Sequence, residues 1–283
     1  MPSASLIEKC CLIANPAAGN ATQYLVEQAF ERGGFDWRFM TFEVEPERLG
    51  DAMRGIRALG FHGVKIGEPF QTGVAEHVDE LTDAARKCGS INCITAVGDR
   101  LVGDNTEATA FVTLVRQQID PVGRPATVLG AGRMARVIAM ALAGAGSTPI
   151  TIASRNATAG QQLVESIQQQ SSSTATYVSL GGGASPVQAD TALLVNATSL
   201  GSTKPEAKLP LDVESFGPKL VVAELAYNTG RTWLSAQAAQ KGCRVIDGLS
   251  LYVEQTALAL KAWTGTAPDT IAMHEAAEEF LGI

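Results

Sequence analysis

The fold is set by the segment Val128-Leu129-Gly130-Ala131-Gly132-Arg133-Met134-Ala135-Arg136, in which an apolar run meets a G-x-G-x-x-A pattern and then a helical spacing of apolar residues. In such a strand–turn–helix unit, the first glycine permits a tight turn and the second lets a pyrophosphate approach the backbone. The small third residue lets the helix pack closely on the strand. The pattern predicts dinucleotide contacts from Gly130, Ala131, Gly132, Arg133, Met134 and Ala135. The alternative is a glycine-rich turn that only packs a helix.

The end of the next expected strand indicates which dinucleotide is bound. An NAD-binding unit usually carries Asp or Glu there, to hold the ribose 2′-hydroxyl. This chain has Ser154 and Arg155 instead. A guanidinium suits a 2′-phosphate through charge-assisted hydrogen bonds, so the sequence favours NADP over NAD as the cofactor. The alternative for Arg155 is a solvated surface side chain.

Strand-like and helix-like segments alternate on both sides of this unit. Strands are expected at 11–14, 39–44, 63–66, 126–129, 149–153, 193–196, 220–224 and 244–246, with a hairpin over 91–102. Helices are expected at 23–32, 46–59, 74–88, 134–145 and 232–241, and surface loops at 168–176 and 181–186. The alternation predicts an α/β protein, and 283 residues at about 150 per domain predict two domains.

Composition narrows the classes of partner and compartment. Lys and Arg number 22 against 29 Asp and Glu, a net charge of −7, and no basic tract is present, so nucleic acid and anionic membrane are not expected as partners. No apolar run reaches the eighteen residues of a membrane span, and the start does not read as a signal peptide. The five cysteines form neither a disulfide framework nor a metal array with the three histidines. We therefore expect a cytoplasmic protein, a monomer or homodimer, without a metal.

At this point the chain resembles the shikimate and quinate dehydrogenase family over essentially its whole length. The landmarks occur in the family's order: Ile13-Ala14-Asn15-Pro16, Ile91-Asn92, Gly103-Asp104-Asn105-Thr106-Glu107, Gly130 to Ala135, Asn196-Ala197-Thr198-Ser199, Tyr227-Asn228, Asp247-Gly248-Leu249, Glu254-Gln255 and Trp263-Thr264-Gly265. The resemblance implies an N-terminal α/β substrate domain of residues 1–105 with 245–283. It also implies a Rossmann-type NADP-binding domain of residues 106–244.

The resemblance also implies an activity and ligands. The activity is hydride exchange between a nicotinamide and the ring alcohol of a small carboxylic acid, as in aromatic amino acid biosynthesis. Asn92, Asn105 and Gln255 match substrate ligands, although each asparagine could equally satisfy the backbone of a turn. Asn196 and Thr198 match the dinucleotide path, whereas Tyr227 and Gly248 match the nicotinamide end. Tyr227 has packing as its alternative role.

The departures from the family lie in the substrate domain. Where the family reads N-V-T-x-P-x-K, this chain reads Lys65-Ile66-Gly67-Glu68-Pro69-Phe70-Gln71, so Gln71 replaces the catalytic Lys and Gly67 replaces a substrate-facing Thr. The family's N-T-D ends here in Glu107. Its S-x-S pair, which holds the substrate carboxylate, becomes Asn20 and Thr22.

These departures leave the proton-transfer group open, because Gln71 can orient an oxygen but cannot titrate. Glu107 and Lys65 are the candidates. Lys65 precedes Gly67 by two residues, so on a strand both face one side and Lys65 could extend into the space over Gly67. The alternative is a strand-end Lys that reaches solvent. Two functions remain: an NADP-dependent shikimate-type or quinate-type dehydrogenase, or a catalytically degenerate relative that binds a dinucleotide and a small acid.

Overall fold

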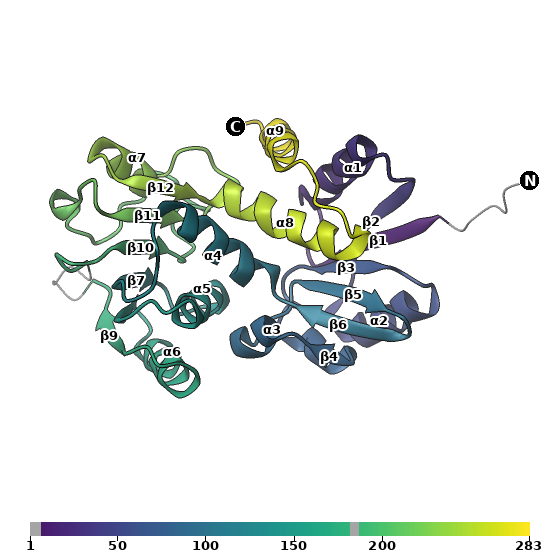
Figure 1. The fold of residues 1–283 in the computed structure, drawn as a ribbon, viewed down its shortest axis with the longest axis horizontal. Helices are drawn as coiled ribbons and strands as arrows, with labels where there is room; N and C mark the ends of the chain where they lie inside the picture. The colour runs from purple at the N-terminus through teal and green to yellow at the C-terminus, as the bar shows by residue number, and fades with distance from the viewer. Residues whose placement is uncertain (1–6, 182–186) are drawn as a thin grey trace, which may run out of the picture. The chain divides into compact units, whose positions relative to one another are not determined.

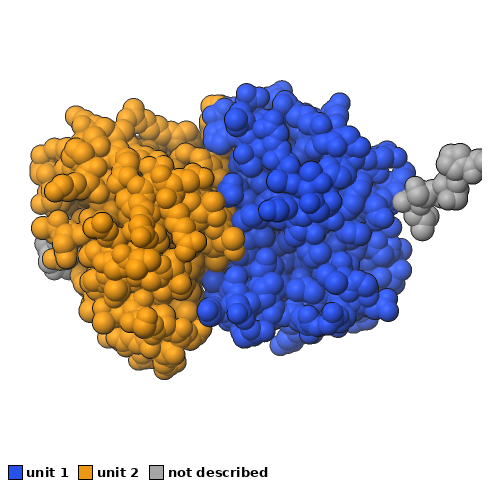
Figure 2. All heavy atoms as spheres, viewed as in Figure 1, with its two compact units in different colours: residues 1–106, 253–282 blue, residues 107–252, 283 orange. Residues whose placement is uncertain are grey.

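A computed structural model describes residues 7–181 and 187–283 of the chain. The expected loop over 181–186 therefore lies, apart from Gly181, outside the described residues. The chain divides into two compact units, one of residues 1–106 with 253–282 and one of residues 107–252 with 283 (Figure 2).

The first unit is built on a mixed six-stranded sheet of the described residues, in the order β2-β1-β3-β5-β6-β4. β3 and β5 pair antiparallel, as do β5 and β6, whereas β1 is parallel to both of its neighbours. Its elements are β1 (Glu8–Ala14), α1 (Thr22–Gly33), β2 (Trp37–Glu43), η1 (Pro46–Arg48), α2 (Leu49–Ala58), β3 (Gly63–Ile66), η2 (Gly73–His77), β4 (Glu80–Leu81), α3 (Asp83–Cys88), β5 (Cys93–Val97), β6 (Arg100–Asp104) and α9 (Thr270–Leu281).

The second unit holds an all-parallel sheet of six described strands, in the order β12-β11-β10-β7-β8-β9 (Figure 1). This is the strand order of a doubly wound dinucleotide-binding fold, with β7 at the point where the order reverses. Its elements are β7 (Ala126–Leu129), α5 (Arg133–Gly144), β8 (Ile150–Ser154), α6 (Ala157–Gln170), β9 (Ala175–Ser179), β10 (Leu193–Asn196), η3 (Val213–Ser215), β11 (Val221–Glu224), α7 (Trp233–Gln240) and β12 (Arg244–Asp247).

Two helices cross the division of the chain into units. α4 (Thr106–Gln118) begins on the last residue of the first unit, and α8 (Gly248–Thr264) contributes its first five residues to the second unit and the rest to the first. The sequence assigned residues 245–252 to the substrate domain, but β12 pairs with β11 in the dinucleotide sheet. The pairing covers residues up to Asp247, and the division of the chain into units extends the second unit to residue 252.

Burial explains why each sheet forms. All four residues of β7, β10 and β11 are buried, as expected for parallel strands covered on both faces. Leu129, Leu194 and Val222 belong to the apolar core of the second unit, and Ile13 and Ile94 to that of the first. The predicted α/β fold with two domains is confirmed.

The C-terminal segment completes the first unit, and contacts from α8 and α9 show how. Trp263 of α8 is buried over Gly63 of β3 and donates its indole N–H to the Ile94 carbonyl at 3.1 Å. A Cβ on Gly63 would lie 2.2 Å from the Trp263 ring nitrogen, so the indole requires glycine there. On α1, the Tyr24 hydroxyl donates to Glu279 of α9 at 3.0 Å.

One predicted helix, over 74–88, is wrong. The segment is instead η2, the short strand β4 and α3. The Asp79 carboxylate accepts the Leu101 N–H at 2.7 Å and so ties this stretch to the sheet. The hydroxyl of Thr82 then caps α3 by accepting the Ala85 N–H at 3.2 Å. The loop predicted over 168–176 is also wrong at both ends, because α6 continues to Gln170 and β9 begins at Ala175.

Candidate functional site

The glycine-rich turn of the second unit connects β7 to α5. Gly130 has φ +107°, and a Cβ there would lie 2.9 Å from the Ala197 carbonyl oxygen. Gly132 lies in open space, where a Cβ would meet no atom within 4 Å. Ala135 is fully buried between helix and sheet. The turn thus has the close packing and the open approach that a dinucleotide pyrophosphate requires.

The start of α5 faces this opening without a side-chain cap. Gly132 is the N-cap residue, and no side chain caps the helix there. The N-terminal N–H groups of a helix have no partner within the helix and attract anions.

A pocket of about 360 Å³ adjoins the turn. Six of the predicted cofactor residues line this pocket: Gly130, Ala131, Gly132, Ser154, Arg155 and Thr198. Five further lining residues were not predicted from the sequence: Asn156, Ala159, Leu180, Ala197 and Ser199. Asn156 could have been found, because an Asn before a helix is a strong N-cap signal. Its side chain accepts the Ala159 N–H at 3.0 Å at the start of α6. Leu180 lies too far along the chain to be found from a local pattern.

Arg155 is an exposed side chain at the end of β8. Among the described residues, no hydrogen bond or ion pair engages its guanidinium. Ser154 beside it is buried, and its hydroxyl donates to the Asn156 carbonyl at 2.7 Å. Arg155 is therefore available for an anionic group at this end of the pocket, whereas Ser154 shapes the loop.

Asn196 and Thr198 brace the loop after β10. The Asn196 amide donates to both carboxylate oxygens of Glu224 at 3.0 Å, and its carbonyl oxygen accepts the Thr198 hydroxyl at 2.7 Å. Burial raises the pKa of the Glu224 carboxyl, although the Asn196 bond opposes that rise. Asn196 thus supports the pocket without lining it, while Thr198 lines it.

Tyr227 and Gly248 lie outside this pocket. The Tyr227 ring stacks on Tyr252 with centroids 4.5 Å apart and planes within 3°. Burial, and secondarily the charge of Glu107, raise the pKa of the Tyr227 phenol. A Cβ on Gly248 would lie 2.5 Å from the Ala226 carbonyl oxygen, so close packing requires this glycine.

Glu107 is buried on the first turn of α4 and pairs with Arg133. Its two oxygens lie 2.7 and 3.4 Å from the two terminal nitrogens of the guanidinium. The Arg133 side chain therefore extends toward Glu107, and neither Arg133 nor Met134 lines the pocket.

A buried polar cluster occupies the first unit around Gln255 of α8. The Lys65 ammonium donates to the Gln255 side-chain oxygen, and the Asn92 amide donates to the same oxygen at 3.0 Å. The Asn92 oxygen accepts the backbone N–H of Thr106 at 2.8 Å. Lys65 is only 4 % exposed, so the alternative of a solvated strand-end Lys is wrong. The structure brings together Lys65, Asn92 and Gln255, three of the predicted site residues.

The space expected over Gly67 is not available to Lys65. A Cβ on Gly67 would lie 2.7 Å from the Ala14 Cβ, so Ala14 fills that space and Lys65 turns to Gln255. Asn105 is fully buried, and its amide donates to the Ser90 carbonyl at 3.0 Å, which is the backbone role left open by the sequence.

Gln71 has one unused hydrogen-bonding atom. Its amide nitrogen donates to the Ile66 carbonyl at 2.8 Å, but its buried oxygen has no partner among the described residues. A buried unpaired oxygen is costly unless a ligand supplies a donor. Gln71 therefore keeps one unpaired hydrogen-bond acceptor in the interior of the first unit.

Asn20 and Thr22 hold the start of α1. The Asn20 side-chain oxygen accepts the Thr22 backbone N–H at 2.9 Å, and Thr22 is 2 % exposed. This bond ties Asn20 to the backbone just before α1, whose N-cap residue is Ala21, and Thr22 is buried there.

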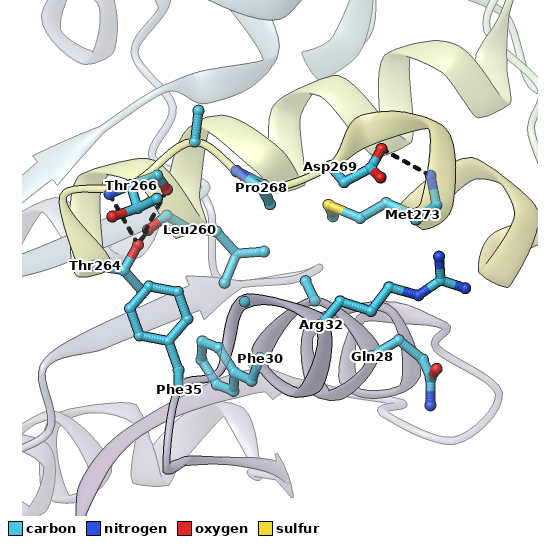
Figure 3. A pocket seen from close by; sticks show the side chains of 14 residues that line it. Gln28, Phe30, Arg32, Phe35, Leu260, Thr264, Thr266, Pro268, Asp269 and Met273 are labelled. Atoms are coloured by element: carbon cyan, nitrogen blue, oxygen red, sulfur yellow. Dashed lines mark hydrogen bonds between the residues drawn. The ribbon is translucent and has the colours of Figure 1, made fainter.

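A second pocket, of about 270 Å³, lies between α1 and the α8–α9 connection (Figure 3). Phe30, Leu260 and Met273 provide apolar walls, and Arg32 and Asp269 line it as well. None of the predicted site residues lines it. Among the described residues there is no cluster of His, Cys, Asp or Glu that would hold a metal, and no helix is long and apolar enough to cross a membrane.

Comparisons with known proteins agree with this geometry. A family model described as shikimate dehydrogenase substrate binding domain matches residues 12–94, and one described as shikimate / quinate 5-dehydrogenase matches residues 113–185. The chain is 33 % identical over 262 residues to the shikimate dehydrogenase (NADP(+)) of Geobacter metallireducens, covering 91 % of each chain.

Two solved structures extend the likeness over nearly the whole fold. The ligand-free 5-ketofructose reductase of Gluconobacter sp. strain CHM43 is 30 % identical, with a TM-score of 0.93 and coverage of 97 % of this chain and 99 % of that one. The shikimate 5-dehydrogenase of Listeria monocytogenes, in complex with shikimate and NAD, is 26 % identical, with a TM-score of 0.88 and coverage of 95 % and 96 %. The chain belongs to the shikimate and quinate dehydrogenase family.

Proposed function

We propose that this protein is an NADP-dependent oxidoreductase of the shikimate dehydrogenase type, which exchanges a hydride between the nicotinamide and a ring alcohol or ketone of a small polyhydroxylated molecule. The observation that carries the proposal is the open Gly132 beside the unengaged Arg155, in a pocket at the switch point of a doubly wound sheet. The catalytically degenerate alternative is not favoured, because relatives that align with more than nine-tenths of the chain are named as shikimate dehydrogenases.

The residues of the second unit fit NADP. The backbone at Gly130 to Gly132 and the start of α5 would receive the pyrophosphate, and Arg155 would receive the 2′-phosphate near the start of α6. Bound there, the nicotinamide supplies the hydride.

The proton requires a group of the chain, and Lys65 is our proposed donor. Its ammonium is buried and oriented by the Gln255 oxygen, which also receives the Asn92 amide. A positioned acid–base group contributes about 10² to 10⁴ in rate. The Gln71 oxygen, which has no partner among the described residues, would accept a substrate hydroxyl and orient the ring. Glu107 is the alternative proton-transfer group.

The substrate class has two candidates. The first is the carboxylic acid of shikimate or quinate, as the family implies. The second is a neutral polyhydroxy ketone, because Thr22 is buried and its backbone N–H donates to the Asn20 oxygen. The residues at the family's carboxylate-holding positions are therefore engaged with the chain itself. The likeness to a protein named 5-ketofructose reductase, at 30 % identity, supports this second candidate.

One assay separates the candidates. Purified protein would be given NADP with shikimate or quinate, and NADPH with 5-ketofructose, while the absorbance of the reduced nicotinamide is followed. Oxidation of shikimate or quinate supports the acid, and faster reduction of the ketose supports the neutral substrate. Absence of turnover in every arm, together with absence of NADP binding, contradicts the proposed function.

We also propose a cytoplasmic location and a monomeric or homodimeric state. The support for the location is that all five cysteines are buried and none forms a disulfide, as expected in a reducing compartment.

A further inference from the structure

Arg133 occupies a position at which helix electrostatics disfavour a cation. It is the first residue of α5, and the first turn of that helix carries no acidic residue. The N-terminus of a helix bears partial positive charge on its unpaired N–H groups. An anion is therefore needed to stabilise the guanidinium there.

In the structure that anion is Glu107. Both of its oxygens approach the guanidinium, at 2.7 and 3.4 Å, in a forked ion pair. The side chains of Arg133 and Glu107 are only 19 % and 10 % exposed, so solvent screens the pair weakly. Glu107 lies in the first turn of α4, where the dipole of that helix favours a carboxylate even without Arg133.

The place of Arg133 in the chain suggests a second anion. It directly follows Gly132, whose Cβ position is open and which lines the 360 Å³ pocket. A diphosphate bound at this turn would carry two negative charges, against the single charge of Glu107, and would also face the N–H groups of α5.

We propose that Arg133 pairs alternately with Glu107 and with the diphosphate of a bound dinucleotide, so that binding of the dinucleotide releases the Glu107 carboxylate. Glu107 is then an internal anion that competes with the cofactor for one guanidinium. The inference rests on the proposed function, because it needs a dinucleotide at this turn. It makes the candidate proton acceptor available only when the cofactor is present.

A binding cycle tests the competition without any turnover. NADP would be titrated calorimetrically into the wild type, Glu107→Gln, Arg133→Met and the double variant at one ionic strength. Glu107→Gln is expected to tighten NADP binding about two- to fivefold, since the ion pair that the dinucleotide must replace is worth up to about 1 kcal/mol. Arg133→Met is expected to weaken binding about tenfold. In the Arg133→Met background, Glu107→Gln should change the affinity by less than about twofold.

Controls keep the outcomes distinct. Glu165→Gln removes an exposed carboxylate of α6 in the same unit and should leave the affinity unchanged. Glu107→Met replaces Glu107→Gln if the latter fails to fold. Unchanged affinity in both Glu107 variants, or equal tightening with and without Arg133, overturns the alternation while NADP still binds. If the wild type binds no NADP, the proposed function itself fails.

Discussion

Replacing Arg155 with alanine should weaken binding of NADP far more than binding of NAD. The guanidinium is exposed, lines the pocket beside Gly130 and Thr198, and has no partner among the described residues. The substitution therefore breaks nothing in the free protein, and the whole effect falls on the bound state. A hydrogen bond to a charged group is worth about 1.5 to 3 kcal/mol. Because the Arg155 guanidinium is exposed and solvent weakens its interaction with a phosphate, we expect about 1.5 to 2 kcal/mol. This corresponds to a roughly 10- to 30-fold increase in the NADP dissociation constant.

The assay is a calorimetric titration of each cofactor at two salt concentrations. NAD affinity should change by less than about twofold, because NAD lacks the 2′-phosphate. The NADP preference of the wild type should shrink as salt rises, since an exposed charge pair is screened. Arg124→Ala is the matched control, because it removes an exposed arginine of the same unit that does not line the pocket. Equal losses for NADP and NAD, or an equal loss in the Arg124 variant, would refute the assignment of Arg155.

Four further predictions concern the acid–base groups and the fold. Lys65→Met should lower kcat by about 10²- to 10⁴-fold in protein that remains folded by circular dichroism, and unchanged kcat would remove Lys65 from the mechanism. In the Lys65→Met background, Gln71→Lys should restore shikimate turnover by up to that same factor, measured by reduced nicotinamide, and no restoration would show that a Lys at position 71 does not move the proton. Gly63→Ala should destabilise by about 1 to 3 kcal/mol in urea unfolding because its Cβ meets the Trp263 ring, whereas the control Gly55→Ala, open in α2, should stabilise slightly. Burial raises the pKa of Glu224, so at pH values just above the ordinary Glu pKa the folded state holds a proton that the unfolded state has lost. The free energy of unfolding of the wild type, relative to that of Glu224→Gln, should therefore fall as the pH rises through this range. Urea unfolding at several pH values measures it, and a relative stability that rises with pH would contradict the prediction.

The dinucleotide turn was predictable because its determinants are local. A buried strand, two glycines and a small residue on the following helix lie within ten residues, and each is required by a contact in that same segment. The unengaged Arg155 at the next strand end followed from the same logic.

The polar cluster of the first unit was predictable only in part. Lys65 and Gln255 are 190 residues apart, and no local pattern shows that β3 and α8 bring them together. The alternation of side chains along the strand predicted that Lys65 would extend over Gly67. Packing prevents this, because Ala14 from the neighbouring strand already fills the space over Gly67. The pairing of Glu107 with Arg133 likewise depends on how α4 and α5 pack. The failed helix over 74–88 has the same origin, since Asp79 bonds to Leu101 across the sheet.

The two glycines of the turn, Gly130 and Gly132, are needed for different reasons. Gly130 is required by the protein itself, since its positive φ and the Ala197 carbonyl leave no room for a side chain. Gly132 is different, because a Cβ there would meet no atom of the protein within 4 Å. As the N-cap residue of α5 it could be replaced without a clash, at the modest cost of a poorer cap. A methyl group at position 132 would instead stand where a diphosphate approaches the backbone, so Gly132→Ala separates the folding of the turn from its use as a ligand site.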